Sequence, residues 1–345
     1  MVRYILGGRK ENFVLTLPAD THLLQDYFSE VRRLHCTYSE DAQCTIYCCP
    51  IVFDRNSNES PVLVRCADIL WSFAGISGMY PNNPISIPTS VYSVPLRLAE
   101  TVNGWDAGPG AIGEDMHMLL KSFFGVSGRL VTRTVFSAAS QCNVSGTKQR
   151  FLLDFESMHA RYRQGMRHMW GALDSGYAVT RFLRSIHAPT LKHAALLHML
   201  WQAHFFPVHL VLGFAGGSLM PRILGVRHIH PALDYVMTMC AHIRTLTFLG
   251  MNFAFYFYEK YHEVCAQARS QDMADAELSA HISFRNRWHW RYVGERVAFP
   301  IAGFVYGTLP ASIAEVCHLW TDRLVYVVSR KPQFPIKLVA MTRGS

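Results

Sequence analysis

Three long segments of this chain carry almost no charge, and they constrain the possible fold more than any other feature. They are residues 194–214, 235–256 and 297–320, and the only charged side chains within them are Arg244 and Glu315. A helix needs about 20 predominantly apolar residues to cross the hydrocarbon core of a bilayer. Each segment is therefore long enough and apolar enough to be a candidate transmembrane helix.

The rest of the composition agrees with a membrane location. Charged residues make up 17% of the chain, whereas soluble proteins usually carry about a quarter. Basic residues collect in 161–192 and 260–296, while the loop after the first segment holds only Arg222 and Arg227. Because basic residues favour the cytoplasmic side, we expect 193–345 to form about three spans of a multi-pass protein with a cytosolic N-terminal part. The pattern leaves the organelle open between plasma membrane, Golgi and endoplasmic reticulum.

Two other classes of protein are disfavoured. The net charge of +8 is not concentrated in a run of basic and aromatic residues, so we expect no nucleic-acid partner. The nine cysteines form no CxxC pair that would indicate a zinc site. Their odd number and scattered positions suit a reducing compartment.

Residues 1–150 have the pattern of an α/β domain. The runs 13–17, 44–53 and 129–136 are rich in β-forming residues and predict strands. Residues 23–31 place apolar side chains at helical spacing, and 62–80 predicts a buried or interfacial helix.

Asp20 follows directly after the first of these predicted strands. An acid at the end of a strand can hold a metal ion at the edge of an α/β sheet. Aspartate is also a favoured N-cap, and a helix is predicted to follow. The sequence leaves both roles open.

A second acidic site begins with the Gly- and Pro-rich loop 104–113. Glu114 and Asp115 come next, and an apolar run that can form a helix starts at Met116. Unpaired N–H groups and the helix dipole at this end favour negative charge, so we expect Asp115 to be held ionised and suited to accept a proton. The alternative is a helix cap with an acid in the first turn.

Residues 151–192 predict interfacial amphipathic helices. Gln164, Arg167 and His168 are spaced to share one helical face, and Trp170 follows closely. An amide, a guanidinium and an imidazole together suit a diphosphate and sugar hydroxyls. The alternative is a basic amphipathic helix on a membrane surface.

Asp20, Glu114-Asp115 and Gln164-x-x-Arg167 occur in the order and spacing of the motifs of membrane-bound family-2 glycosyltransferases. The chain resembles this family from about Phe13 onward, and it looks closest to the fungal glycosyltransferase 2-like proteins among the cellulose-, chitin- and hyaluronan-synthase-like enzymes. The resemblance implies a partial GT-A-like catalytic domain, a Rossmann-related mixed sheet, over 1–150, followed by the helical transmembrane region.

The resemblance also implies a reaction. A sugar would move, with inversion, from a nucleoside diphosphate sugar, expected to be a UDP-sugar, to a polysaccharide or lipid-linked acceptor. Asp20 would hold a divalent metal, Mn²⁺ or Mg²⁺. Asp115, with Glu114 beside it, would be the general base that deprotonates the acceptor hydroxyl.

The resemblance further implies that the predicted helix over residues 161–171 supplies the substrate-binding side chains. Gln164 and Arg167 match the residues that bind the diphosphate and the acceptor end. His168 stands where the family has Trp, and Trp170 lies two residues further on.

Departures from the family pattern keep two alternatives open. Pro18 replaces the first acid of the metal-binding motif, and the first nucleotide-binding strands of the family fold are not in this chain. We therefore expect an N-terminally truncated relative, which could be an inactive membrane scaffold. An unrelated polytopic transporter is the second alternative, with His204 and Arg244 as its intramembrane polar residues.

Overall fold

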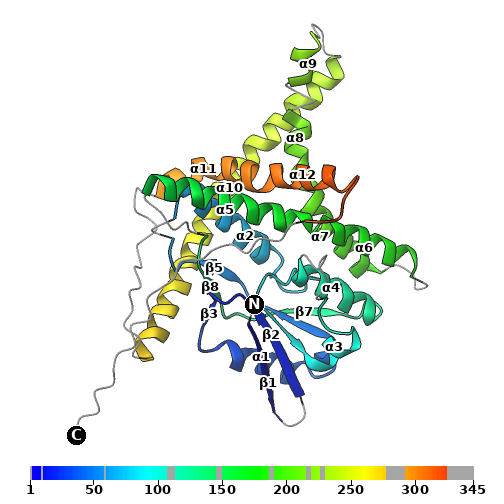
Figure 1. Ribbon diagram of the computed structural model, residues 1–345, viewed down its shortest axis with the longest axis vertical. Coiled ribbons are helices and arrows are strands. Elements are labelled where there is room, and N and C mark those ends of the chain that lie inside the picture. Colours follow the sequence, from blue (N-terminus) through cyan, green and yellow to red (C-terminus); the bar gives the residue numbers. More distant parts are fainter. Residues whose placement is uncertain are drawn as a thin grey trace.

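The computed structural model of this protein describes residues 2–8, 11–57, 60–106, 113–144, 150–185, 190–214, 219–225, 230–276 and 292–324. Strands occupy the N-terminal part of the chain and a largely helical part follows (Figure 1). The strands are β1 (Val2–Gly8), β2 (Glu11–Leu17), β3 (His22–Leu23), β4 (Thr45–Cys48), β5 (Ile51–Phe53), β6 (Tyr92–Pro95), β7 (Val131–Thr134) and β8 (Ala139–Gln141). The helices among and just after them are α1 (Tyr27–Thr37), α2 (Val62–Ser77), α3 (Leu96–Thr101), α4 (Glu114–Gly125), α5 (Arg150–Trp170) and α6 (Ala172–Leu183).

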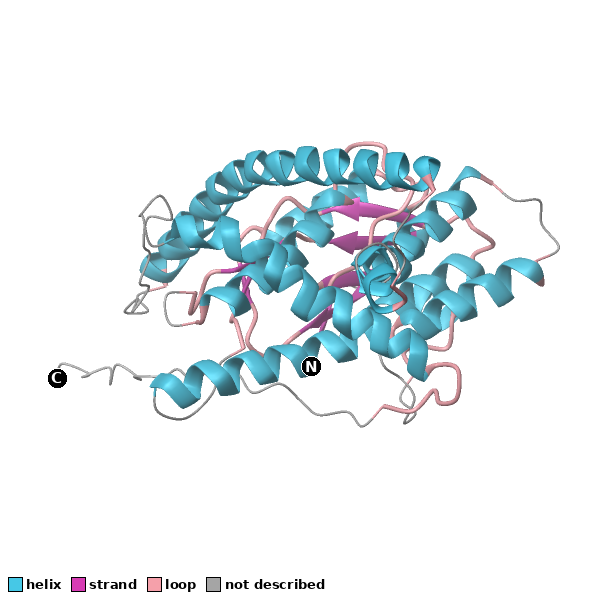
Figure 2. Ribbon diagram, turned by 90° about the horizontal axis from the view of Figure 1, so that it is seen from above, coloured by secondary structure: helices cyan, strands magenta, loops and turns pink. Residues whose placement is uncertain are grey.

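The strands form two sheets. The five-stranded sheet has the order β1-β2-β6-β4-β7, in which β4 and β7 are parallel and the other neighbours are antiparallel. The three-stranded sheet has the order β3-β8-β5, with β5 parallel to β8. Helices lie on both sides of the strands when the molecule is viewed from above (Figure 2). The prediction of an α/β domain with mixed sheets is confirmed.

The run 44–53 was expected to be one strand, and that expectation is wrong. It contains two strands that belong to different sheets, because Cys49 and Pro50 interrupt the ladder. Proline has no N–H group to donate across a sheet, so the pairing of β4 cannot continue through it. The carbonyl of Pro50 instead accepts from the N–H of Ala139, at 2.9 Å, which starts the pairing of β5 with β8.

Helix α4 connects the sheet to the helical part of the chain. Its buried side chains, which include Met118, Leu119 and Phe123, share one apolar core with β4 and β6. Leu196 and Leu200 of the following helix α7 (Leu191–Leu200) belong to the same core. Burial of this continuous apolar surface therefore holds the first helices after residue 190 against the α/β domain.

The three apolar segments differ in structure. The first is α7, a π-helical turn (Trp201–Phe205), a 3₁₀ turn (Phe206–Val208) and α8 (His209–Phe214), and Pro207 lies in the interruption. Helix α8 and the short α9 (Met220–Ile223) project from the body of the molecule (Figure 1). The second segment lies inside α10 (Pro231–Asp275), a helix of 45 residues. Nearly all of residues 231–250 are exposed.

The third segment lies in the continuous helix Val293–Cys317, which comprises α11 (Val293–Gly303), a π-helical turn and α12 (Leu309–Cys317). Within the described ranges, this is the one helix that is long and apolar enough to cross a membrane. A single such helix is weak evidence for a membrane location. The expected three spans therefore stay a prediction.

A buried ion pair joins the α/β domain to this helix. Nε of Arg65, on α2, lies 2.6 Å from Oε1 of Glu295, on α11, and both side chains are almost completely buried. The Arg65 guanidinium also donates to the carbonyls of Ser57 and Ser60. Breaking a buried pair leaves a charge without its partner, which is much more costly than breaking an exposed pair.

Replacing one member of this pair should therefore destabilise the protein strongly. We expect Arg65→Met to lower the free energy of unfolding by about 3–5 kcal/mol, and Arg65→Met/Glu295→Met to restore part of that loss. Arg33→Met, which removes the exposed pair with Glu30, is the matched control and should change the free energy of unfolding little, because solvent screens an exposed pair. Denaturant titration in mild detergent measures all three. Equal effects of Arg65→Met and Arg33→Met would contradict a structural role for the buried pair.

Candidate functional site

A cavity of about 2200 Å³ lies between the ends of the strands and the helical part of the chain. Typical small-molecule sites occupy roughly 300–1,000 Å³, so this cavity has room for a ligand of several units. The polar side chains in its wall include Asp20, Arg55, Glu114, Asp115, Gln164 and Arg167. Helix α10 contributes Ile243, Thr247, Phe248 and Met251 to the same wall.

The transporter alternative does not fit this arrangement. An unrelated transporter would have no α/β sheet before residue 193, whereas two mixed sheets are present there. Asp20 and Asp115 line the same cavity as well. His204 and Arg244, the polar residues expected inside the membrane of a transporter, both line the cavity. Nδ1 of His204 is hydrogen-bonded to Oγ of Ser175 at 2.9 Å. Arg244 lies on α10.

Asp20 is not a helix cap. Helix α1 begins at Tyr27 and Asp26 occupies its N-cap position. The Asp20 carboxylate instead accepts a hydrogen bond from the N–H of Cys142, which follows β8, at 3.1 Å. The Arg55 guanidinium donates to the Asp20 carbonyl oxygen. Asp20 therefore ties the end of β2 to the ends of β5 and β8.

Glu114 and Asp115 form the first turn of α4, as the sequence predicts. Gly113 precedes them with φ of 78°, a left-handed conformation that favours glycine. Oδ1 of Asp115 accepts from the N–H of Met116 at 2.8 Å. The Tyr92 hydroxyl, which accepts from Trp105, lies 3.5 Å from the Glu114 carboxylate. The backbone thus presents both carboxylates to the cavity.

Burial has an effect on the pKa of Asp115 that its position at the helix N-terminus does not reveal. Burial raises its pKa to about 6, and the hydrogen bonds from the backbone and the positive charge of Arg167 offset only part of this effect. Desolvation disfavours the charged carboxylate more strongly than these groups favour it. A carboxylate with a pKa of about 6 is still largely ionised at neutral pH and is a stronger base than an exposed aspartate.

One face of α5 lines the cavity. Gln164, Arg167 and His168 all lie in its wall, so the predicted sharing of a helical face is confirmed. Oε1 of Gln164 is buried and has no hydrogen-bond partner among the residues that the structure describes. Trp170 is not part of the wall. It is 4% exposed and its indole N–H donates to the carbonyl of Asp322 at 3.1 Å.

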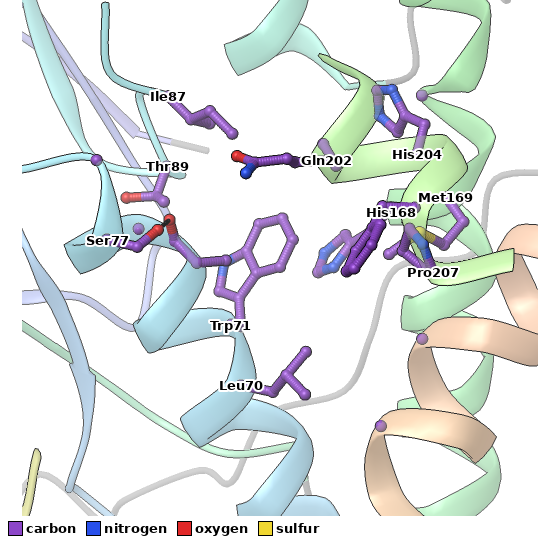
Figure 3. A pocket seen from close by; sticks show the side chains of 18 of the residues that line it. Leu70, Trp71, Ser77, Ile87, Thr89, His168, Met169, Gln202, His204 and Pro207 are labelled. Carbon is purple, nitrogen blue, oxygen red and sulfur yellow. Dashed lines mark hydrogen bonds between the residues drawn. The ribbon is translucent and has the colours of Figure 1, made fainter. Parts of the chain in front are cut away.

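His168 stacks on Trp71, an aromatic residue that the sequence reasoning did not select. The two ring centroids are 4.3 Å apart and the rings are inclined by 28°. Trp71 projects from α2 toward His168, with Gln202 nearby (Figure 3). The pair forms an aromatic wall within the cavity. No local signal marks Trp71, because the contact joins residues 97 positions apart in the chain.

A chain of charged groups lies next to the acidic pair and was also missed. Nδ1 of His117 is 2.6 Å from Oδ1 of Asp174, and its Nε2 is 2.9 Å from Oδ2 of Asp106. Lys121 binds the other oxygen of Asp106 at 2.7 Å. The Asp174 carboxylate raises the pKa of His117, which favours the imidazolium form. The negative charge of Asp174 also raises the pKa of Asp115, so the chain of charges influences the candidate base.

A second group of polar side chains is buried in the cavity wall. Arg161, one turn before Gln164, places Nε 2.8 Å from Oδ1 of Asp68, and Asn143 donates to the other oxygen of Asp68 at 2.5 Å. Asp68 and Arg161 are 2% and 3% exposed. This pair fixes α5 against α2 and so sets the positions of the α5 residues that face the cavity.

The metal expected at Asp20 finds few protein ligands. Across the described residues, no group of three or more His, Cys, Asp or Glu side chains is arranged to hold a metal ion. Pro18 supplies no side-chain oxygen, and one oxygen of Asp20 already accepts from a backbone N–H. Divalent cations such as Mg²⁺ and Mn²⁺ need several oxygen ligands, and this donor set does not provide them.

The sequence was compared with known families and proteins. The model of the family described as "Glycosyl transferase family group 2" matches residues 13–259, which include most of β2, the strands β3 to β8, α5 and most of α10. No curated protein matches the sequence. The matched range contains every residue selected from the sequence as a candidate for the site.

The burial of Asp115 leads to a prediction about stability. Its pKa in the folded protein, about 6, lies above the usual 3.8, so ionisation costs stability as the pH rises through this interval. Asp115→Asn removes this cost, because asparagine does not ionise. Since part of the carboxylate faces the cavity, we expect the gain in stability at pH 7 to be only about 1–2 kcal/mol. The gain should disappear as the pH falls toward 4.

Thermal melting between pH 4 and pH 8 measures this effect. Glu40→Gln, at an exposed position, is the control and should change the melting temperature little at any pH. If Asp115→Asn were less stable than the natural protein throughout this range, the carboxylate would be acting as a stabilising first-turn acid instead.

Proposed function

The chain belongs to the glycosyl transferase family group 2, and on that premise we propose that it moves a sugar, with inversion, from a nucleoside diphosphate sugar to a carbohydrate or lipid-linked acceptor. A UDP-sugar is the donor that we propose. The observation that carries the proposal is the convergence of Asp20, Asp115 and the α5 face on one cavity. These groups come from three distant parts of the chain, and the proposed transfer uses Asp115 as the base and the α5 face to bind the substrates.

Asp115 is the proposed general base. Its carboxylate would take the proton from the acceptor hydroxyl as the hydroxyl oxygen attacks the anomeric carbon of the donor. The bond from that carbon to the diphosphate breaks at the same time, and the nucleoside diphosphate leaves with the bonding electrons. Attack opposite the leaving group inverts the configuration. A pKa of about 6 matches a base that works near neutral pH.

Arg167 and Gln164 are the proposed partners of the leaving diphosphate and of the acceptor. A guanidinium can donate two parallel hydrogen bonds to phosphate oxygens and stabilises the charge that develops on the leaving group. The unsatisfied Oε1 of Gln164 can accept from a sugar hydroxyl. The Trp71–His168 wall gives a flat apolar surface against which a sugar ring of the acceptor can pack.

The inactive scaffold of the same family is the second candidate. The replacement of an acid by Pro18 and the small set of metal ligands near Asp20 favour it. A divalent metal at Asp20 is an expectation of the family resemblance, and no step above depends on it. Binding of UDP separates an enzyme from a scaffold that has lost its nucleotide site.

We propose in addition that the chain is a multi-pass membrane protein with its catalytic part in the cytosol. The apolar helix Val293–Cys317 supports this proposal. The first half of α10 supports it too, because large apolar side chains on several of its faces are exposed, among them Tyr235, Val236, Ile243, Leu246, Leu249 and Phe253. Such a surface is expected to be covered by lipid or protein.

The membrane proposal makes a prediction about extraction. The natural protein, expressed in cells, should remain in the membrane pellet after washing with alkaline carbonate. Leu246→Arg/Leu249→Arg places two charges in the apolar part of α10 and should increase the released fraction severalfold, because charges are costly in hydrocarbon. Phe136→Arg, at an exposed apolar position between β7 and β8, is the control and should not. Complete release of the natural protein would contradict the proposal.

The base assignment makes a prediction about activity. We expect Asp115→Asn to lower kcat for sugar transfer by about 10²–10⁴-fold, while UDP binding stays unchanged, because the amide cannot accept the proton. Radiolabelled transfer from UDP-sugars measures kcat, and calorimetry measures UDP binding. Glu100→Gln, at an exposed position on α3, is the control with full activity. Unchanged transfer by Asp115→Asn would remove this residue from the role of base.

A further inference from the structure

We propose that Asp174, on α6, is a positioning residue for the proposed base: its buried carboxylate, held in place by His117, keeps Asp115 a stronger proton acceptor than it would otherwise be. The inference rests on the proposed function, because it deepens the role given to Asp115. Neither Asp174 nor His117 was selected from the sequence as a site residue. The proposal therefore adds a second helix, α6, to the elements that control the reaction.

The start of α6 packs against the turn that carries the two acids. A Cβ atom added to Gly113 would lie 3.4 Å from Oδ2 of Asp174 and 3.9 Å from Cα of Gly171, the residue before α6. Gly113 directly precedes Glu114 and Asp115, and its φ of 78° is a value that side chains rarely permit. The Asp174 carboxylate therefore lies next to the backbone that presents Asp115 to the cavity.

His117 holds this carboxylate in one orientation. Its Nδ1 is 2.6 Å from Oδ1 of Asp174, and its Nε2 is 2.9 Å from Oδ2 of Asp106. Ionised carboxylates only accept hydrogen bonds, so both ring nitrogens carry a proton and His117 is an imidazolium. Burial raises the pKa of Asp174 and the contact with His117 opposes this effect, so the imidazolium keeps the carboxylate ionised. The ring of Tyr177, also on α6, lies 4.8 Å from the imidazole and packs against it.

The charges around His117 leave part of the Asp174 charge directed at the turn. Lys121 lies 2.7 Å from Oδ1 of Asp106, so the more exposed of the two acids has two cationic neighbours. Asp174 is 5% exposed, and its Oδ2 has no hydrogen-bond partner among the residues that the structure describes. This is the oxygen that faces Gly113. Its negative charge acts on nearby groups through a medium that screens it little.

Asp115 responds to all the charges that face it. Burial and the charge of Asp174 raise its pKa to about 6, against the opposing effects of backbone hydrogen bonds and of Arg167 on α5. Tyr92, on β6, faces the same turn as a neutral hydroxyl, because burial and the charges of Glu114 and Asp115 raise its pKa well above the usual range. Asp174 is thus the acid on a neighbouring helix that makes Asp115 a stronger base.

The pH profile of sugar transfer by the full chain in detergent tests the inference. Asp174→Asn keeps the shape of the side chain and removes its charge, so the acid limb of kcat/KM should move to lower pH by roughly half to one pH unit. The plateau of kcat should fall about two- to fivefold, because a weaker base takes the proton less readily. Asp174→Glu restores the charge and should keep the limb near its natural position. Glu100→Gln, at an exposed position on α3, is the control and should leave the profile unchanged.

A merely structural role would give a different result. If Asp174 only tied α6 to α4, Asp174→Asn would weaken UDP binding or lower kcat equally at every pH, with the acid limb in its natural position. Calorimetry should instead give a Kd for UDP within about threefold of that of the natural protein, because the variant acts on the proton acceptor and not on donor binding. An unmoved limb in a folded Asp174→Asn overturns the inference.

Thermal melting separates this inference from the proposed function. At pH 7, Asp115→Asn should raise the melting temperature about half as much in the Asp174→Asn background as in the natural protein, because the charge that penalises ionised Asp115 is then absent. An equal rise in both backgrounds overturns the inference, whether or not the protein transfers sugar. If the smaller rise is observed but no sugar is transferred from any UDP-sugar, the proposed function fails, while the control of Asp115 by Asp174 is supported.

Discussion

The architecture of the site depends on the point where the chain leaves one sheet for the other. At Pro50 the ladder of β4 ends, since proline has no N–H to donate, and the carbonyl of Pro50 begins the parallel pairing of β5 with β8. That pairing brings the residues after β5 and β8 to one edge. Asp20, at the end of β2, joins them through the N–H of Cys142. The part of the cavity wall around Asp20 is therefore held largely by hydrogen bonds of the backbone.

Buried charges at this edge and in the helical part of the chain are set against each other in pairs. Asp68 with Arg161 fixes α5 on α2, Asp54 with Arg269 fixes α10 beside β5, and Arg65 with Glu295 joins α2 to α11. Each pair is buried, so separating its partners would leave charges in the protein interior without a partner and without water. Each pair therefore fixes the relative positions of the two elements that it joins. The helices that wall the cavity are thereby held in register with the strands that carry the acids.

The cavity combines different kinds of wall. Carboxylates, guanidinium groups, the Trp71–His168 stack and apolar side chains of α10 all line it. Asp115 illustrates the consequence for reactivity. Burial at this site raises its pKa to about 6, so the protein accepts a cost in stability for a stronger base. The same low exposure to water strengthens any charge interaction made by a bound donor.

Local patterns in the sequence were sufficient for a large part of this description. The start of α4 at Glu114 follows from the glycine before it and the apolar run after it, and the shared face of Gln164, Arg167 and His168 follows from the helical repeat. The same repeat explains the position of Trp170. It lies two residues after His168, about 200° further around the helix, and so faces away from the cavity.

The contacts that only the tertiary structure decided are those between distant segments. Trp71 meets His168, Asp174 meets His117, and Arg55 meets Asp20, and none of these pairs has a spacing that a helix or strand repeat would reveal. The effect of burial on the pKa of Asp115 was likewise not readable from the sequence, because helix position is local but desolvation depends on everything packed around the carboxylate. The sequence by itself determined which short elements form and which side chains share their faces, since these depend on neighbours in the chain. The packing of α2, α5 and the strand ends determined which of those side chains meet.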